Sequence, residues 1–142
     1  ISTASAVNDL KLSNAATNTS PTITADGTDT NVGIAIVGKA KGSVQVSKSA
    51  VSSTTQTAAG DCSETTGFII ANSGTALAIG LPNGTTIGEM KVFTNKGAGL
   101  ATITPANFAQ GSTIALSQFD AVTLIWDGTN WYITGHYGAA IA

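Results

Sequence analysis

The stretch that decides the fold lies near the end of the chain and reads Val122-Thr-Leu-Ile-Trp126, Asp127-Gly-Thr-Asn130 and Trp131-Tyr-Ile-Thr134. Apolar residues alternate with a period of two on both sides of a four-residue break that contains the Asp-Gly and Asn typical of hairpin turns. A loop of this length lets Trp126 and Trp131 face each other across the ladder. Such an aromatic cross-strand pair contributes roughly 0.5–1.5 kcal/mol beyond its burial, so the stretch predicts a β-hairpin.

The composition extends this prediction to the whole chain. Among its 142 residues are 22 Thr, 13 Ser and 16 Gly, and only 10% of all residues are charged while 42% are apolar. Thr suits a pleated strand, and Gly and Asn supply the turns between strands. Soluble domains usually carry about 25% charged residues, so we expect part of this surface to be covered by other copies or other proteins. The predicted fold class is all-β.

Charge and hydropathy patterning argue against several classes of partner. The net charge is −2, and all six basic residues are Lys, whereas nucleic-acid binders usually present a basic stripe that includes Arg. The longest apolar runs, residues 33–38 and 68–71, fall far short of the ~20 residues of a membrane-spanning helix. We therefore expect no nucleic-acid partner and no membrane partner. The start of the chain lacks the features of a signal peptide, and Ile1 fits a processed product, a fragment or a recombinant start.

Composition shifts divide the chain into three parts. Residues 1–50 contain short strand candidates with few large side chains, and we expect an extended β arm or fibre-like module that attaches or assembles through other chains. Residues 51–60 are small and polar, which predicts a linker, although one poorly packed strand would read the same way. Residues 61–142 are denser in apolar residues and form the predicted β-sandwich or jelly-roll-like domain.

Strand candidates follow from period-two alternation between turn residues. In the arm they are residues 9–13 and 22–25, then residues 32–36 and 43–47, which flank a glycine-edged turn at 38–42 as a second hairpin. In the last part they are residues 67–71, 76–81, 89–94, 101–104, 113–116, 122–126 and 131–134. About seven short strands in ~80 residues fit a sandwich or a jelly roll.

No residue pattern predicts a catalytic, metal or cofactor site. The single His136 and single Cys62 have no local catalytic signature and cannot fill a zinc ligand set, and the carboxylates beside Cys62 would raise its pKa. The cluster Asp26-Gly-Thr-Asp29-Thr-Asn31 fits Asx-turn capping, with a cation site as the alternative. We expect no catalytic residues, no metal and no cofactor.

Three aromatic residues near the C-terminus are the candidate contact residues. Trp131, Tyr132 and Tyr137 could stack on a sugar or on a neighbouring protein, or they could fill the core of a sandwich. We keep both interpretations for these residues, as a ligand or interface contact and as core.

Several motifs together resemble a known group of proteins. The first half contains Leu10-Lys-Leu12, the run from Pro21 to Asn31, and Gly42-Ser-Val-Gln-Val46, and the second half contains Phe93-Thr-Asn-Lys-Gly-Ala-Gly99 and Leu124-Ile-Trp-Asp-Gly-Thr-Asn-Trp131. These motifs resemble β modules of tailed-bacteriophage virion surface structural proteins, of the fibre and head-decoration type. The module usually has a proline where this chain has Val37.

The resemblance implies a non-enzymatic structural protein at the surface of a phage particle. Its location would be a head decoration, a fibre or a tail-fibre module, its assembly a homotrimer, and its partners other virion proteins of the capsid or tail. The alternative is a receptor-binding adhesin module that recognises a host surface glycan. A carbohydrate-active enzyme is the third interpretation, and it would need a carboxylate pair in a groove.

Overall fold

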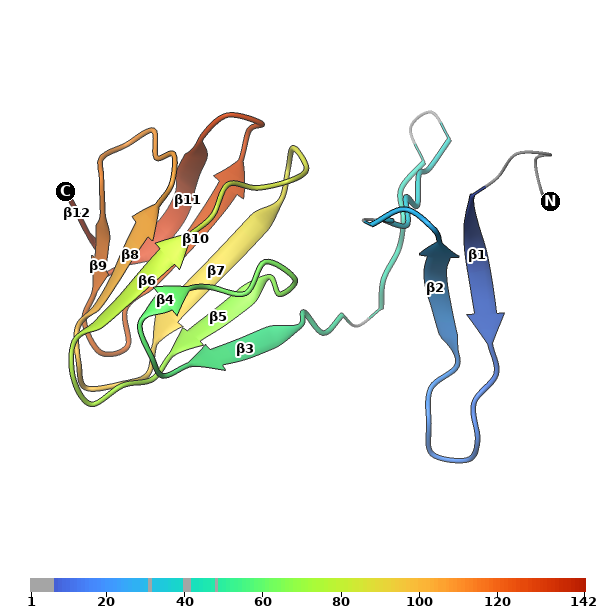
Figure 1. Cartoon of the computed structure of the whole chain (residues 1–142), viewed down its shortest axis with the longest axis horizontal. Helices are drawn as coiled ribbons and strands as arrows, with labels where there is room; N and C mark the ends of the chain where they lie inside the picture. Colours follow the sequence, from blue (N-terminus) through green and yellow to red (C-terminus); the bar gives the residue numbers. More distant parts are fainter. Residues whose placement is uncertain (1–6, 31, 40–41, 48) are drawn as a thin grey trace. The chain divides into compact units, whose positions relative to one another are not determined.

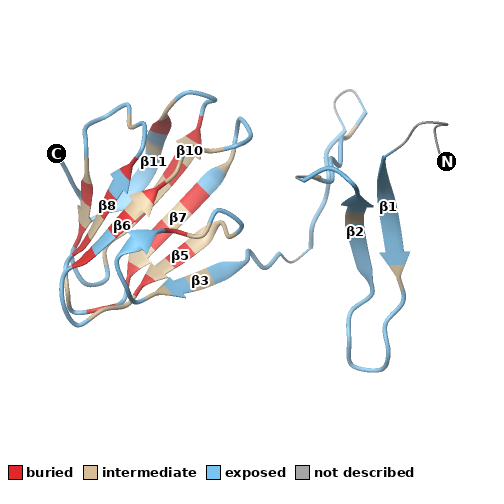
Figure 2. Cartoon of the chain, in the orientation of Figure 1, coloured by how far each residue is buried: buried red, intermediate tan, exposed pale blue. Residues whose placement is uncertain are grey.

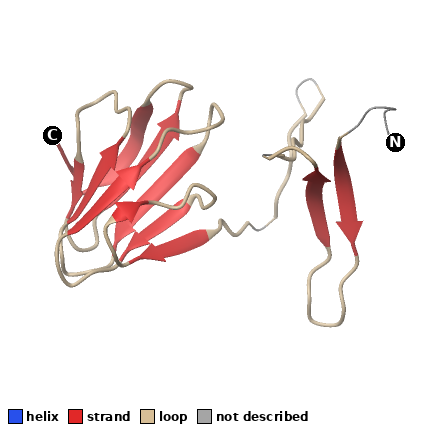
Figure 3. Ribbon diagram, in the orientation of Figure 1, coloured by secondary structure: helices blue, strands red, loops and turns tan. Residues whose placement is uncertain are grey.

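The computed structural model describes residues 7–30, 32–39, 42–47 and 49–142, and the chain divides into two compact units, Ile1–Lys48 and Ser49–Ala142. The described residues contain strands and no helix, which confirms the all-β prediction (Figures 1 and 3). No described helix is long and apolar enough to span a bilayer.

The first unit contains one antiparallel hairpin. Its strands β1 (Asn8–Ser13) and β2 (Thr22–Gly27) pair with Leu12 opposite Ile23 and Leu10 opposite Ala25. Both strands were predicted. The connection closes with a backbone hydrogen bond from the Thr19 amide to the Ala16 carbonyl, 3.1 Å.

The second predicted hairpin of this unit was wrong. The described residues in 32–39 and 42–47 form no strand, although the Gly42 amide donates to the Lys39 carbonyl at 2.9 Å within the predicted turn. Residues 40–41 of that turn lie outside the described residues. Period-two alternation alone did not produce a strand here, because residues 32–36 and 43–47 do not pack against a second layer.

The second unit is a sandwich of two five-stranded sheets, as predicted. The first sheet has the order β11-β10-β7-β5-β3 and the second has the order β12-β9-β8-β6-β4. Strands of the first sheet are β3 (Ser53–Gln56), β5 (Phe68–Ala71), β7 (Met90–Asn95), β10 (Ala121–Trp126) and β11 (Trp131–Tyr137). Strands of the second are β4 (Gly60–Asp61), β6 (Leu77–Leu81), β8 (Ala101–Pro105), β9 (Ile114–Leu116) and β12 (Ala140–Ile141).

The chain crosses between the two sheets at each step from β3 to β8, so neighbouring strands in this half of each sheet are parallel. The later strands pair in antiparallel fashion, and they include the predicted hairpin β10–β11. The mixed pairing differs from the all-antiparallel strands of a jelly roll.

The prediction of a linker at 51–60 was wrong, because half of these residues belong to β3 and β4; the alternative prediction of a strand agrees with β3. Strand β3 pairs in parallel with β5, and the side chain amide of Gln56 donates to the carbonyls of Ala58 and Gly60, which shapes the crossing to β4. Both strands lie at sheet edges, where short polar strands are common. These two strands are held in place by ladder hydrogen bonds to β5 and β6, and the local sequence does not reveal these partners.

The core lies entirely between the two sheets (Figure 2). Strand β10 alternates half-buried and buried residues, and its buried residues Val122, Leu124 and Trp126 point inward. The largest fully buried side chains are Trp131, Phe93, Ile69, Ile79, Leu81, Ile103, Ile114, Leu116 and Leu124.

Candidate interaction surfaces

Trp131 belongs to the core and not to a contact surface. Its side chain is 0% exposed and its indole N–H donates to the Pro82 carbonyl at 2.8 Å. It pairs directly across the ladder with Trp126, with ring centroids 5.4 Å apart and an angle of 53° between the rings. The predicted cross-strand pair is confirmed, and Trp131 as a ligand contact was wrong because burial removes both faces of its ring.

Tyr132 and Tyr137 are the two candidates that reach the surface. Tyr132 points away from the core and is 38% exposed, while Tyr137 at the end of β11 is 73% exposed. A register shift between Thr123 and Leu124 inserts an extra residue into β11, and it changes the course of the strand between the two tyrosines. The three predicted aromatics therefore do not form one stacking platform.

Cys62 and His136 lie on different sheets and make no nucleophile–base pair. Cys62 follows β4 and is buried, whereas His136 lies on β11 and is exposed. Burial raises the pKa of the Cys62 thiol, Lys91 opposes this shift, and the carboxylates of Asp61 and Glu64 add to it. The thiol is therefore a poor nucleophile at neutral pH.

The acidic turn at the end of β2 uses its side chains internally. A carboxylate oxygen of Asp26 accepts the Gly27 amide at 2.9 Å, and a carboxylate oxygen of Asp29 accepts the Asn8 side chain amide at 2.8 Å. Asn31, the last member of the predicted cluster, lies outside the described residues. Within the part of the chain that the structure describes, no three His, Cys, Asp or Glu side chains gather as metal ligands.

Two buried polar residues were missed by sequence reasoning. Lys91 is 3% exposed and its ammonium donates to the carbonyls of Ser63 (2.9 Å), Glu64 (3.1 Å) and Thr66 (2.8 Å), which binds β7 to the crossing between β4 and β5. Asn95 is 1% exposed, and its side chain amide donates to the carbonyls of Gly99 and Leu116. The only available signal was their alternation with Phe93, which places all three on the inward side of β7.

The β1–β2 hairpin carries the most open apolar surface of the first unit. Alternation places Leu10 and Leu12 on one face of β1, and the register sets Ala25 and Ile23 opposite them on β2. Leu10 is 60% exposed, Leu12 is 73% exposed and Ile23 is 61% exposed. We call these residues the hairpin face; Asp9, Lys11, Thr22 and Thr24 alternate with them.

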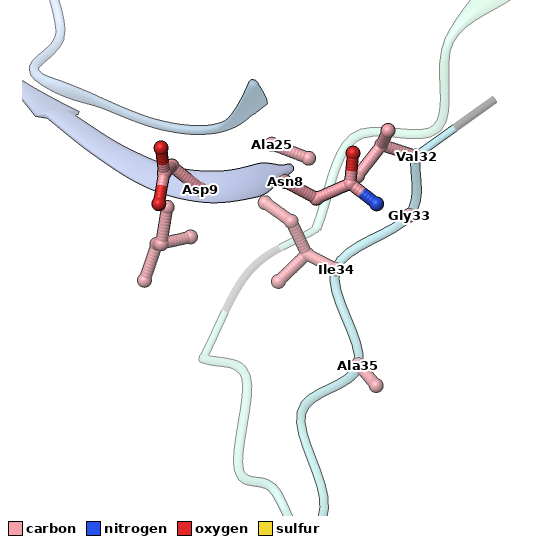
Figure 4. Close-up of a pocket in the computed structure, with 8 residues that line it drawn as sticks. Asn8, Asp9, Ala25, Val32, Gly33, Ile34 and Ala35 are labelled. Carbon is pink, nitrogen blue, oxygen red and sulfur yellow. The ribbon is translucent and has the colours of Figure 1, made fainter. Parts of the chain in front are cut away.

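A shallow groove of about 270 Å³ borders the hairpin face. It is lined by Asn8, Asp9, Leu10 and Ala25 of the hairpin and by residues 32–35 (Figure 4). Ile34 at this groove remains 44% exposed, so the segment after β2 covers the hairpin only in part. The geometry offers apolar contact and no charged cluster.

A comparison with known families gives a match over the sandwich. The model of the phage depolymerase C-terminal beta sandwich domain family matches residues 44–132, which is more than half of the chain and contains nine of the ten sandwich strands in whole or in part. A comparison with curated proteins finds no match. The matched span begins close to the boundary between the two units, and its description agrees with the observed sandwich. This chain belongs to the phage depolymerase C-terminal beta sandwich domain family and is a module of a tail-associated phage protein.

Proposed function

We propose that this chain is a non-enzymatic structural module at the surface of a phage tail, and that it assembles with other copies of itself as a homotrimer. The observation that carries the proposal is the hairpin face, whose apolar side chains are exposed while the sandwich has a complete core of its own. A two-stranded hairpin alone is marginally stable in water and needs a further layer to cover its apolar face. Other copies of the chain are the simplest source of that layer.

The energetics favour burial of the hairpin face against further copies. Complete burial of a Leu or Ile side chain is worth about 1.5–3 kcal/mol. Burial of Leu10, Leu12 and Ile23 against further copies therefore strongly favours association. Three amphipathic two-stranded sheets can enclose a small core between their apolar faces. The tail is favoured over a head decoration because the matched family is named for phage depolymerases.

Sedimentation of the full chain tests the assembly. We expect a mass of three chains, and we expect Leu12→Lys to break the assembly because it places a charge on the hairpin face. Thr22→Lys is the matched control, since Thr22 lies on the opposite side of the same hairpin and should leave the mass unchanged. A full chain that sediments as one copy at every concentration would refute the trimer.

The absence of enzymatic activity is a separate part of the proposal. Depolymerase activity would then belong to other domains of the tail assembly, and this chain would supply a rigid sandwich. Incubation of the chain with host capsular polysaccharide should release no new reducing ends. Release of reducing ends that is lost on substitution of a single carboxylate would overturn this part.

Recognition of a host surface glycan is the second candidate, and the exposure of Tyr137 favours it. An exposed aromatic ring can stack on the apolar face of a sugar. A glycan array should then give hits that Tyr137→Ala abolishes, while Phe119→Ala removes another exposed aromatic ring without effect. An array with no hits would remove this candidate.

A further inference from the structure

The outer faces of the two sheets differ sharply in side-chain size. On the second sheet the outward positions hold small residues, namely Ala78, Gly80, Thr102, Thr104 and Ala115. On the first sheet six outward positions hold large apolar residues, namely Phe68, Ile70, Met90, Val92, Ile125 and Tyr132, and the other outward positions hold small residues such as Thr94, Ala121 and Thr123. A sandwich needs large side chains only on its inner faces, so the size of these outer residues is not explained by the core.

The register joins the six residues into one continuous band. Ile125 lies opposite both Tyr132 and Met90, and Val92 lies opposite Phe68, with Ile70 two residues further along β5. Met90 is 52% exposed, and Phe68, Ile70, Val92 and Ile125 are half-buried. We call these residues the apolar band.

A hollow lies beside the band on the same face. Its volume is about 190 Å³, and it is lined by Ala121, Val122, Thr123, Gly135, His136 and Tyr137. Small residues produce it: a Cβ atom at Gly135 would meet no atom within 4 Å, and Thr123 pairs with Gly135 across the ladder. One face therefore carries both a raised apolar band and a recess of side-chain size.

We infer that this face joins the sandwiches of neighbouring copies, with the apolar band of one copy seated in the hollow of the next. Band and hollow occupy different parts of one sheet. The band lies on β5, β7 and the ends of β10 and β11 next to their turn, whereas the hollow lies at the opposite ends of β10 and β11. The contact is therefore head-to-tail and can close into a ring. The outward strand positions of the band carry no charge, so the face selects an apolar partner and would leave the hydroxyls of a glycan unpaired. The inference deepens the proposed assembly and rests on it.

The area of the outer face of the first sheet is consistent with an interface that also includes the hairpin face. Five strands spaced about 4.8 Å apart, with outward rows about 7 Å apart, give roughly 400–500 Å² of sheet. A standard interface buries about 800 Å² per partner, so this face supplies a large part of one and needs a second contact. The hairpin face provides that contact in the proposed trimer.

Oxidation of Met90 tests the inference in the unaltered full chain. Met90 is the only methionine and lies within the apolar band, so one added oxygen located at Met90 by peptide mass mapping, and thereby distinguished from oxidation of Cys62, reports on this face. We expect hydrogen peroxide to oxidise Met90 at least about tenfold more slowly above the assembly concentration than below it. Assembly with an unchanged oxidation rate would overturn the inference while leaving the proposed trimer standing. A chain that stays monomeric at every concentration would overturn both.

A matched pair of glycine variants gives the second measurement. Gly135→Arg fills the hollow, whereas Gly74→Arg lies in a loop; at both sites a new Cβ has open space and a backbone free of the left-handed region, so both variants should fold. We expect Gly135→Arg to raise the dissociation constant of the assembly at least about tenfold and Gly74→Arg to leave it unchanged. Equal dissociation constants for the two variants would overturn the inference. Glycan binding lost only in Gly135→Arg, with assembly intact, would overturn it in favour of a sugar site.

Discussion

Two of the antiparallel hairpins, β1–β2 and β10–β11, have the same alternating pattern and opposite outcomes. In β1–β2, Leu12 lies opposite Ile23 and the two side chains are 73% and 61% exposed. In β10–β11, Trp126 lies opposite Trp131 and the two are 5% and 0% exposed. The difference is a second sheet: within its own unit the later hairpin is covered by one, whereas the unit of β1–β2 contains no second sheet among its described residues. Alternation makes a strand amphipathic, but a packed partner layer decides whether the apolar side becomes core.

The largest test of this comparison truncates one residue in each hairpin. Trp131→Ala should lower the free energy of unfolding of the sandwich by about 3–5 kcal/mol, because it leaves a cavity in a packed core. Leu12→Ala should change the same quantity by less than about 0.5 kcal/mol, because its side chain is already in water in the single copy. Urea unfolding of the monomeric chain, followed by circular dichroism, measures both. Equal losses would mean that the hairpin face is covered within one copy.

The second test removes the hydrogen bonds that hold the crossing from β4 to β5 against β7. Lys91→Met takes away the ammonium that serves three backbone carbonyls, and we expect a loss of about 2–3 kcal/mol in unfolding free energy. Lys96→Met is the control, since Lys96 is an exposed lysine of the same region and should have little effect. Urea midpoints compare the two variants. If they agree, the loop from β4 to β5 keeps its place without Lys91.

A smaller test probes the packing around the covered hairpin. Gly84 lies against the ring of Trp126, and a new Cβ there would overlap the ring, so Gly84→Ala should cost about 1–3 kcal/mol. Gly74→Ala introduces the same methyl group into open space and should be nearly neutral. Thermal unfolding distinguishes them. A neutral Gly84→Ala would show that Trp126 can shift without loss.

The smallest effect belongs to the turn of the covered hairpin. Backbone amides of Asn130 and Thr129 donate to Asp127 at 2.7 Å and hold the pKa of its carboxyl below the ordinary value of 3.8. A lowered folded-state pKa adds stability that is full above the ordinary value and is lost as the pH falls through the folded-state value. Asp127→Asn should lower stability slightly at neutral pH and flatten the acid side of the stability curve, so that the variant and the unaltered chain converge below the folded-state pKa. An acid limb identical to that of the unaltered chain would show that the turn does not depend on this charge.

Sequence patterns predicted the strands that carry large apolar residues. The strand candidates from 67–71 to 131–134 are all present, as is the Trp126–Trp131 pair. Strands β4 and β12 were missed, and β3 was predicted only as the alternative to a linker. All three are short edge strands that are ordered by ladder hydrogen bonds to a neighbouring strand. The segments at 32–36 and 43–47 show the converse error, since they alternate without a layer to pack on.

The candidate surfaces were less predictable than the strands. Trp131, Tyr132 and Tyr137 look equivalent in the sequence, yet Trp131 is buried and a register shift separates the other two. The apolar band was also invisible, because six large residues from four strands become one surface only through the pairing register. The side of a strand that faces the core is set by partners far away in the sequence.

The sequence by itself determined the all-β class, the positions of the principal strands and the tryptophan-paired hairpin, because alternation and turn residues act over a few neighbouring positions. Only the tertiary structure decided which alternating face became core, which remained open to other copies, and that Lys91 is buried. Those outcomes depend on the crossing of the chain between two sheets from β3 to β8, and burial is a property of the layer that covers a residue.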